Sequence, residues 1–426
     1  MKVLILTYYW PPAGGSGVQR WLKFVKYLQE FGITPVVYTV ENPDFSIQDE
    51  GLLNEIPSNI EVLKQPIWEP YQLVNLLSKG KKNMTNAGFL SQQKSMFGRL
   101  SSYIRANYFI PDARMFWIKP SVSYLEKYLK ENPVDLIISS GPPHSLHCIA
   151  MKLKQKMNLK WISDFRDPWT DIDYFHQLPL TKKALEKHKL YEQNVVSKSD
   201  AVVVVGETMR KNYLALNSNT VVLSNGFDTE VTSDKVVLDT AFSITHIGMM
   251  NEDRNPRVLW EVLSELTEEI DGFSAALEIQ LIGKIDASVT DEIEKNQLEK
   301  NTSFISYVPH EEVQNYQKKS QLLLLSINRV PSAKGIVTGK VFEYLVAKRP
   351  ILAIGPIDGD LANILEATKA GSIVGFDDKE QLKSELIKMY QIFKETRLSV
   401  NSIGIEKYHR KEITKKLAEL IKQTVA

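Results

Sequence analysis

The sequence predicts an α/β protein built from two doubly wound domains, each a parallel sheet covered by helices on both faces. A length of 426 residues suits two or three domains. Short runs rich in Val, Ile and Leu alternate with amphipathic segments along nearly the whole chain. Near-continuous apolar strands separated by helices are typical of parallel sheets that are buried on both sides.

The first half opens with "KVLILTYY", which reads as a strand, followed by an amphipathic helix over 17–32 that ends at Gly32. A second strand, "TPVVYTVE", follows directly. Further strands of this half are expected at 134–140, 159–165, 200–206 and 220–224. We expect an N-terminal domain over 1–212 that carries an insertion at 70–111.

The second half repeats the pattern, with strands expected at 242–248, 277–283, 302–308, 321–327, 349–355 and 370–376. Strand patterning lapses after "SNGFDTEVTSD", and we expect a C-terminal domain over 213–405. The tail, 406–426, places four apolar residues on one helical face, Ile413, Leu417, Leu420 and Ile421. We expect this helix to cross back and pack on the N-terminal domain.

Composition excludes several classes of protein. The chain is 43% hydrophobic and 24% charged with a formal net charge of +1, so it has no overall field that would attract nucleic acid. Cys148 is the single cysteine, which rules out an intrachain disulfide and favours a reducing compartment. No run of about 18 apolar residues occurs, and "MKVLILTYYW" is too short for a signal peptide. We expect a cytoplasmic protein and leave attachment to the surface of the inner membrane open.

The segment 70–111 differs in composition from the rest of the chain, because it contains no Asp or Glu. Its basic residues are Lys79, Lys81, Lys82, Lys94, Arg99 and Arg105, and Leu, Met, Phe and Tyr are interleaved with them. Such a composition is typical of a surface that lies on anionic lipid. The alternative is a helical cap over a binding cleft, with the lysines facing water.

The stretch "WPPAGGSGVQRW" follows the first strand and opens a helix. Gly15 and Gly17 would let the backbone approach a ligand, and a helix N-terminus offers free amides and partial positive charge. A dinucleotide fingerprint, with Glu41 on a ribose, fits badly because its third glycine position holds Arg20. A plain loop with convenient glycines is the other interpretation.

Two more strand ends of the first half carry polar side chains. "SSGPPHSLH" places His144 after a buried strand, and "WISDFRDPW" places Asp164, Arg166 and Asp167 at and after the end of the next. Ligands of open parallel sheets bind outside the carboxyl ends of the strands, so all four are candidate contacts. The alternatives are a helix-capping turn at His144 and an internal Arg–Asp pair. The acid pairs "DID" and "DGD" read as solvated loop acids, and no metal site is expected.

The second half supplies cations at strand or loop ends. Arg254 follows "HIG" along a loop, Lys284 follows "LIG", and Lys340 opens "KVFEYL". Three cations at one edge of a sheet suit a diphosphate.

The start of the helix in "GIVTGKVFEYLVAKRPILAIGP" also suits a phosphate. Thr338 is a plausible N-cap that would leave the amides of Gly339, Lys340 and Val341 free. Glu343, one turn further, would accept hydrogen bonds from the two hydroxyls of a ribose. A surface pair between Lys340 and Glu343 is the alternative.

Together these stretches resemble the retaining family-4 glycosyltransferases, whose GT-B architecture has two Rossmann-like domains facing across a cleft. Similar are the glycine loop "PPAGGSG", the mid-chain "SNGFD", and "GKVFEYLVAKRPIL" in the second half. "SSGPPHSLH" and "WISDFRDPWTD" look like a bacterial subgroup of these enzymes. The resemblance covers nearly the whole chain.

The resemblance implies a role for each candidate residue. Arg254 and Lys284 would hold the diphosphate and act in catalysis, and Glu343 would hold the ribose. The other donor contacts would be Gly15, Gly17, Val308, Thr338, Gly339 and Lys340. His144 would also act in catalysis. The residues that orient the acceptor or the donor sugar would be Asp164, Arg166 and Asp167.

Two positions depart from the family pattern. The first of its two glutamates, which usually contacts the donor sugar, falls on Gly335. The arginine that usually follows the glycine of "HIG" is Met249. The sugar is therefore not predicted.

The resemblance implies transfer of a sugar from a nucleotide diphosphate sugar to a glycan or lipid-linked acceptor, with retention, in bacterial surface polysaccharide synthesis. Fixed cations and amide dipoles would stabilise the leaving diphosphate, so no metal or other cofactor is expected. The leaving phosphate would take the acceptor's proton. The alternatives are a non-catalytic nucleotide-sugar-binding protein of the same fold and an NAD-dependent epimerase or dehydrogenase.

Overall fold

The computed structural model describes residues 1–426 except 44, 46–47, 69–95, 174, 230–235 and 307. The chain forms two compact units, which we call unit 1 (Met1–Asn225 with Arg410–Ala426) and unit 2 (Gly226–His409). Unit 1 extends beyond the end expected at residue 212, and the chain returns to it at Arg410 rather than at residue 406. The first difference arises because the strand expected at 220–224 forms, as Thr220–Val222, and pairs within the unit 1 sheet.

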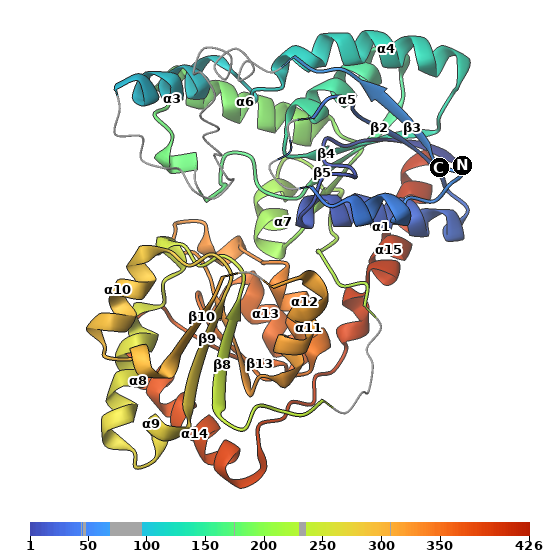
Figure 1. The fold of residues 1–426 in the computed structure, drawn as a ribbon. Coiled ribbons are helices and arrows are strands. Elements are labelled where there is room, and N and C mark those ends of the chain that lie inside the picture. Colours follow the sequence, from blue (N-terminus) through green and yellow to red (C-terminus); the bar gives the residue numbers. More distant parts are fainter. Residues whose placement is uncertain (44, 46–47, 69–95, 174, 230–235, 307) are drawn as a thin grey trace. The chain divides into compact units, whose positions relative to one another are not determined.

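Unit 1 contains a seven-stranded parallel sheet in the order β3-β2-β1-β4-β5-β6-β7. The strands are β1 (Lys2–Leu6), β2 (Thr34–Val40), β3 (Glu61–Gln65), β4 (Leu136–Gly141), β5 (Lys160–Phe165), β6 (Ala201–Val204) and β7 (Thr220–Val222). The helices are α1 (Ser16–Leu28), α3 (Met96–Tyr108), α4 (Ile118–Glu131), α5 (Ser145–Met157), α6 (Lys182–Lys198), α7 (Glu207–Leu214) and α15 (Arg410–Val425). Helices cover both faces of this sheet (Figure 1).

Unit 2 contains a six-stranded parallel sheet in the order β10-β9-β8-β11-β12-β13. The strands are β8 (Phe242–Ile247), β9 (Leu277–Ile282), β10 (Thr302–Ile305), β11 (Leu322–Ser326), β12 (Ile351–Ile354) and β13 (Gly371–Val374). The helices are α8 (Arg257–Glu269), α9 (Phe273–Ala276), α10 (Ala287–Lys295), α11 (His310–Lys319), α12 (Lys340–Ala347), α13 (Asp360–Thr368) and α14 (Lys379–Thr396). The predicted fold class, two parallel α/β domains, is confirmed.

The core of each unit lies on both faces of its sheet, which explains the near-continuous apolar strands. In β1, Leu4 and Leu6 pack into one cluster while Val3 and Ile5 pack into the cluster on the other face. Every residue of β4, β8 and β11 is buried. Parallel strands with helices on either side bury both sets of alternating side chains, so an amphipathic alternation does not develop.

The last helix, α15, belongs to unit 1. Its buried residues Ile413, Leu417 and Ile421 recur at helical spacing and join the core cluster that contains Trp21 and Leu22 of α1. The two helices pack against each other (Figure 1). The chain therefore begins and ends in the same compact unit.

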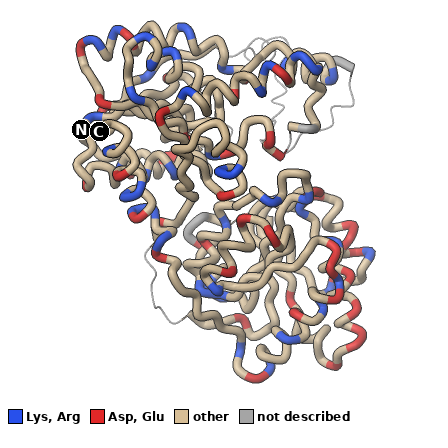
Figure 2. Tube along the Cα trace, turned by 180° about the vertical axis from the view of Figure 1, so that it is seen from behind, with Lys and Arg blue, Asp and Glu red and all other residues tan. Residues whose placement is uncertain are grey.

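The expected insertion at 70–111 is described only in part. Residues 69–95, with Lys79, Lys81, Lys82 and Lys94, lie outside the described residues. From there α3 runs over Met96–Tyr108 and contacts α6. Among the described helices, none combines the length and apolar composition that a bilayer crossing requires. Lys and Arg are interspersed with Asp and Glu over both units, as the balanced composition predicts (Figure 2).

Candidate functional site

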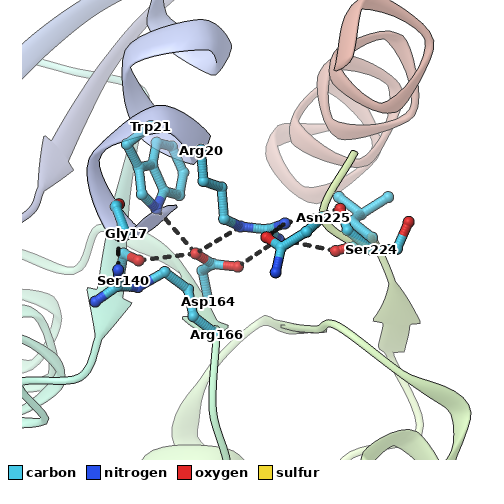
Figure 3. Close-up of polar contacts among 9 residues, drawn as sticks. Gly17, Arg20, Trp21, Ser140, Asp164, Arg166, Ser224 and Asn225 are labelled. Carbon is cyan, nitrogen blue, oxygen red and sulfur yellow. Dashed lines mark hydrogen bonds and ion pairs between the residues drawn. The ribbon is translucent and has the colours of Figure 1, made fainter. Parts of the chain in front are cut away.

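Asp164 is the last residue but one of its strand, β5, and lies inside a buried polar cluster of unit 1 (Figure 3). Its oxygens accept hydrogen bonds from Arg20 (2.8 Å), from Trp21 Nε1 (2.9 Å) and from Ser140 Oγ (2.8 Å). Burial opposes ionisation, but the charge and hydrogen bonds of Arg20 outweigh it, so the pKa of Asp164 is lowered. Asp164 is only 1% exposed, so it contacts these partners inside unit 1, and its role in orienting a sugar stays a prediction.

Arg20 is the partner that the sequence did not reveal. Its guanidinium also donates to the carbonyl oxygens of Leu223 and Ser224, each at 2.9 Å, and to Asn225 Oδ1 at 3.5 Å. The internal Arg–Asp pair was one interpretation of "SDFRD", but the arginine comes from α1. Arg20 thus fixes the end of unit 1, where the chain leaves for unit 2, to the strand end at Asp164 (Figure 3).

Arg166 lies against the glycine loop. It donates from Nη1 to the carbonyl oxygen of Gly17 (3.2 Å) and from Nη2 to that of Pro142, and its guanidinium lies over the Tyr9 ring. A Cβ atom at position 17 would stand 2.5 Å from Arg166 Nη1, so glycine is needed for this contact. Gly15, the N-cap of α1, has φ +93°, which also favours glycine. The loop and Arg166 therefore form one structure. Asp167 follows; the residue as a whole is exposed, but burial of its carboxyl group raises the pKa of Asp167.

His144 directly precedes α5 and stacks on Trp169, with ring centroids 4.2 Å apart and planes 4° apart. It is 7% exposed, and burial, then the nearby His147, His188 and Arg166, lower the pKa of His144 well below its usual value. The imidazole is therefore neutral. Its Nδ1 atom is buried and finds no hydrogen-bond partner among the described atoms.

The loop that carries Trp169 is held by a second buried acid. Glu192 of α6 accepts hydrogen bonds from the Trp169 amide (3.3 Å), from Thr170 Oγ1 (2.5 Å) and from the Tyr213 hydroxyl (2.6 Å). The Trp169 indole donates to His188 Nδ1 (3.1 Å). Sequence reasoning missed Glu192. The available signal was its place on the buried face of a helix, four residues after His188.

In unit 2, two glycines end neighbouring strands at the carboxyl edge of the sheet. Gly248 follows β8 with φ +105° and Gly283 follows β9 with φ +116°. A Cβ atom on Gly283 would meet the Gly248 carbonyl oxygen at 2.9 Å, so the two chain segments touch there. The loops beyond remain paired, since the Met250 amide donates to the carbonyl oxygen of Lys284 at 3.0 Å. The exposed Lys284 side chain lies in this edge.

Arg254 closes the first of these loops. It lies in the short 3-10 turn Glu252–Arg254, donating from Nη1 to the Met249 carbonyl oxygen (3.3 Å) and from Nε to Asn328 Oδ1. Arg254 is thereby anchored to the loops after both β8 and β11.

Lys340, the first residue of α12, lies beside Arg254 and His246. Its Nζ atom is 3.2 Å from His246 Nε2. Burial first, then the Arg254 charge, lower the pKa of Lys340 to about 7, and Glu343 only partly opposes this. The alternative surface pair with Glu343 is not formed in the described structure. Glu343 is exposed and accepts a hydrogen bond from Gln317 Nε2 (3.2 Å).

The expected cap at Thr338 is wrong. Gly339 is the N-cap and already has helical dihedral angles, φ −57° and ψ −26°, so the first turn closes around it. The Val341 amide donates to the Thr338 carbonyl oxygen (3.3 Å), so that amide is not free, and Thr338 Oγ1 is buried without a partner among the described atoms. Val308, expected to line the base, is half-buried between β10 and α11.

Metal ligands are not gathered in the described ranges, where no group of three or more His, Cys, Asp or Glu side chains could hold an ion. In "DGD", Asp358 pairs with Lys334 (2.5 Å) while Asp360 is buried at the start of α13. The interpretation of both as solvated loop acids is therefore wrong for Asp360.

No protein-family model and no curated protein sequence matches the chain. Solved structures do match. A TarM mutant of S. aureus, in complex with fondaparinux, alpha-GlcNAc-glycerol and UDP, is 13% identical over 99% of this chain and 99% of that chain, with a TM-score of 0.58. WaaG, a glycosyltransferase involved in lipopolysaccharide biosynthesis, is 13% identical over 98% and 99%, with a TM-score of 0.55. A putative UDP-N-acetylglucosamine 2-epimerase from Listeria monocytogenes is 12% identical over 99% and 96%, with a TM-score of 0.56. The chain has the GT-B fold of glycosyltransferases.

Proposed function

We propose that the protein is a retaining glycosyltransferase that uses a nucleotide diphosphate sugar. The observation that carries the proposal is the arrangement of Lys340 and Arg254 at the carboxyl edge of the unit 2 sheet. These two cations repel each other, and burial makes the repulsion costly. A diphosphate bound between the loops after β8 and β9 would relieve that repulsion, and Lys284 would add a third cation.

The same edge suits the rest of a nucleotide. Glu343 exposes its carboxylate one turn from Lys340, where it could accept hydrogen bonds from the two hydroxyls of a ribose. We assign the base to the segment at Val308. When the bond to the sugar breaks, negative charge collects on the diphosphate, and fixed cations stabilise it without reorganisation. The leaving phosphate would accept the proton of the acceptor hydroxyl, and we propose that no metal is needed for this step.

In unit 1, we assign contacts with the acceptor or the donor sugar to His144, Arg166 and Asp167. The neutral imidazole of His144 has an unsatisfied Nδ1 atom, which suits a hydrogen bond with a sugar hydroxyl. Arg166 supports the Gly15–Gly17 loop, and we assign to that loop a contact with the donor phosphate. Asp164 would act indirectly, by holding Arg20.

A panel of nucleoside diphosphates and their sugars tests the proposal. We expect one base to raise the melting temperature, and its sugar nucleotide to be consumed when acceptors are added. Product analysis by proton NMR would show the anomeric configuration retained. Activity that chelator abolishes and magnesium restores would contradict the metal-free mechanism.

A non-catalytic nucleotide-sugar-binding protein is the second candidate, favoured by Gly335. This residue ends the 3-10 turn Ala333–Gly335 and offers no carboxylate where the resembling enzymes contact the donor sugar. Tight binding of a sugar nucleotide without transfer or hydrolysis would support this candidate. Conversion to an epimeric sugar nucleotide would instead indicate the reaction named for the Listeria neighbour.

We further propose a cytoplasmic protein whose α3 lies on the inner membrane, where a lipid-linked acceptor for surface polysaccharide would be found. α3 exposes an apolar stripe at helical spacing, Leu100 (55%), Tyr103 (40%), Ile104 (40%) and Tyr108 (66%). Arg99 and Arg105 are exposed on the same helix, which contains no acidic residue. Apolar and basic side chains together suit an anionic lipid surface, and each basic residue contributes about 1 kcal/mol at best.

Co-sedimentation with vesicles of phosphatidylglycerol and phosphatidylcholine tests this surface. We expect binding at low salt that Arg99→Glu with Arg105→Glu abolishes. Lys415→Glu with Lys416→Glu is the charge-matched control, since both lysines are exposed on α15 of the same unit. Equal loss in both double variants would show that net charge, rather than α3, controls binding, and no binding at low salt would contradict the proposal.

A further inference from the structure

A histidine lies inside the central strand of unit 2. His246, in β8, is 0% exposed, and its Nδ1 atom lies 3.2 Å from the Leu324 carbonyl oxygen of β11. A carbonyl can only accept, and a second backbone contact of the ring, with Met249, also favours a ring proton. Because the Lys340 amine faces Nε2 and can donate to it, we assign the proton to Nδ1 and the lone pair to Nε2. That lone pair faces Lys340 Nζ at 3.2 Å, and the lysine is the donor.

The surrounding backbone is shaped for this contact. A Cβ atom on Gly248 would lie 2.8 Å from Lys340 Cε and 2.9 Å from Nζ, so a larger residue would displace the end of the lysine from this position. One residue earlier, the Ile247 amide donates to the Tyr344 hydroxyl (3.3 Å), which joins β8 to α12. The position of Lys340 is therefore set by the strand as well as by its own helix.

The charged groups that face Lys340 do not neutralise it. Arg254, from the turn Glu252–Arg254, repels its proton, while Glu343 on α12 attracts it more weakly. His246 cannot share the charge, because burial first, and then Lys340, lower the pKa of His246 well below its usual value. Burial and Arg254 lower the pKa of Lys340 to about 7. Near neutral pH, the Lys340 amine is thus the group here that gains or loses a proton.

We propose that His246 is the positioning residue of a proton-coupled phosphate site: it holds the Lys340 amine at the carboxyl edge of β8, and a phosphate group that binds there brings a proton onto that amine. The proposal rests on the proposed function for the identity of the ligand as a diphosphate. The neutral imidazole fixes the amine without competing for its charge. The remaining N–H bonds of the protonated amine are then available to phosphate oxygens.

The direction of the pH dependence follows from linkage. Above about pH 7 the free protein holds Lys340 largely neutral, and an anion at the amine favours its charged form. Binding above that pH therefore takes up a proton, and affinity should fall as pH rises, by up to about tenfold per pH unit. Below that pH the lysine is already charged, so its contribution to the pH dependence should disappear.

The first experiment needs no ligand. The chain has seven histidines, so selective ¹⁵N labelling gives a spectrum that His246→Gln assigns. We expect His246 to keep the neutral Nδ1–H tautomer down to about pH 5, while its Nε2 resonance shifts with a midpoint near that of Lys340. Lys340→Met should remove this shift. A flat Nε2 resonance from about pH 6 to about pH 9, or an imidazolium pattern at neutral pH, would overturn the inference.

The second experiment is calorimetry with inorganic pyrophosphate at about pH 8 in two buffers of different ionisation enthalpy. We expect pyrophosphate binding to the wild type to take up close to one proton more than binding to Lys340→Met. The variant serves as the reference, because its proton uptake comes from pyrophosphate itself. His246→Leu should weaken binding about tenfold and change its pH profile, and His246→Gln, whose amide oxygen can accept from Lys340, should restore both. His409→Gln, at a histidine of unit 2 that packs against Phe227, is the matched control and should leave pyrophosphate affinity and its pH profile unchanged.

The outcomes separate this inference from the proposed function. Pyrophosphate binding without proton uptake, or a His246→Leu variant with the wild-type pH profile, overturns the role of His246 and leaves the glycosyltransferase proposal standing. Absence of binding by pyrophosphate and by every nucleoside diphosphate would overturn both.

Discussion

Unit 1 and unit 2 each place charged side chains at the carboxyl ends of parallel strands, but the charges interact in opposite ways. In unit 1, Asp164 and Arg20 attract each other at 2.8 Å, and both are buried. In unit 2, Lys340 and Arg254 repel each other, and the hydrogen-bond partner of the Lys340 amine is a neutral imidazole. Unit 1 pairs opposite charges to hold backbone segments together, whereas unit 2 places two like charges at one edge of its sheet.

This contrast predicts opposite effects on stability. Removing one member of an attractive buried pair leaves the other charge without compensation, which destabilises the fold. Removing one of two like charges relieves repulsion and costs binding instead. The variants below test that difference, beginning with the largest expected effect.

Asp164→Asn should destabilise the protein by about 3–5 kcal/mol, because Arg20 would keep a buried charge without its carboxylate. Thermal unfolding by calorimetry measures the effect. Asp171→Asn, at an exposed acid of the same unit, is the matched control and should change stability by less than about 0.5 kcal/mol. Equal melting temperatures for the two variants would refute the structural role of the pair.

Arg254→Ala should lower the affinity for the preferred nucleoside diphosphate by about 2–3 kcal/mol, roughly 30- to 150-fold, while the protein stays folded. Lys284→Ala should have a smaller effect, because the Lys284 side chain is more exposed and better hydrated. Both should reduce transfer activity. Isothermal titration together with circular dichroism checks this, and wild-type affinity in a folded Arg254→Ala variant would remove Arg254 from the donor site.

Glu343→Ala should weaken nucleoside diphosphate binding by about 1.5–3 kcal/mol, roughly ten- to hundredfold, if its carboxylate binds the ribose. The matching ligand control is inorganic pyrophosphate, which has no ribose and should bind the variant as well as the wild type. An equal loss for both ligands would mean that Glu343 acts through Lys340 and not on the sugar.

Much of the fold could be predicted because its signal is local. Runs such as "LIISSG" and "LLLLS" are buried on both faces, so the apolar pattern alone indicates a parallel strand. The strand β3 was not predicted, because its apolar pattern is weak. It lies at the edge of the sheet, is half-exposed, and its sequence "EVLKQ" is too polar to stand out.

Residues of the candidate site could be predicted only where the residue type and its local position in the sequence were enough to indicate a role. Arg254 and Lys340 stand out as cations at strand or helix ends. Arg20 and His246 did not, because their meaning depends on partners 144 and 94 residues away in the chain. In the sequence, Arg20 is noticed only because it occupies the third glycine position of a dinucleotide-binding pattern. His246 is one polar residue in an otherwise apolar strand.

Lys340→Met has the smallest expected effect on the free energy of unfolding. Its sign is informative, because we expect the variant to be more stable than the wild type. It should stabilise the protein at neutral pH by about 1 kcal/mol, because a buried cation beside Arg254 is removed. The unfolded chain keeps the lysine proton up to a pH of about 10.5, whereas the fold gives it up near 7. Wild-type stability should therefore rise with pH across that window relative to the variant, and thermal unfolding at about pH 7 and about pH 9 measures this. Lower stability of the variant at both pH values would contradict the repulsion.

The central claim is that the carboxyl edge of unit 2 binds a diphosphate. The most direct measurement is a cycle of four titrations, in which the wild type and Arg254→Ala each bind the preferred nucleoside diphosphate and its monophosphate. We predict that loss of the β-phosphate weakens binding to the wild type at least about tenfold but much less to the variant, a coupling of about 1–3 kcal/mol. If the loss is equal in both proteins, or if neither nucleotide binds the wild type, the assignment of this edge to a diphosphate is wrong.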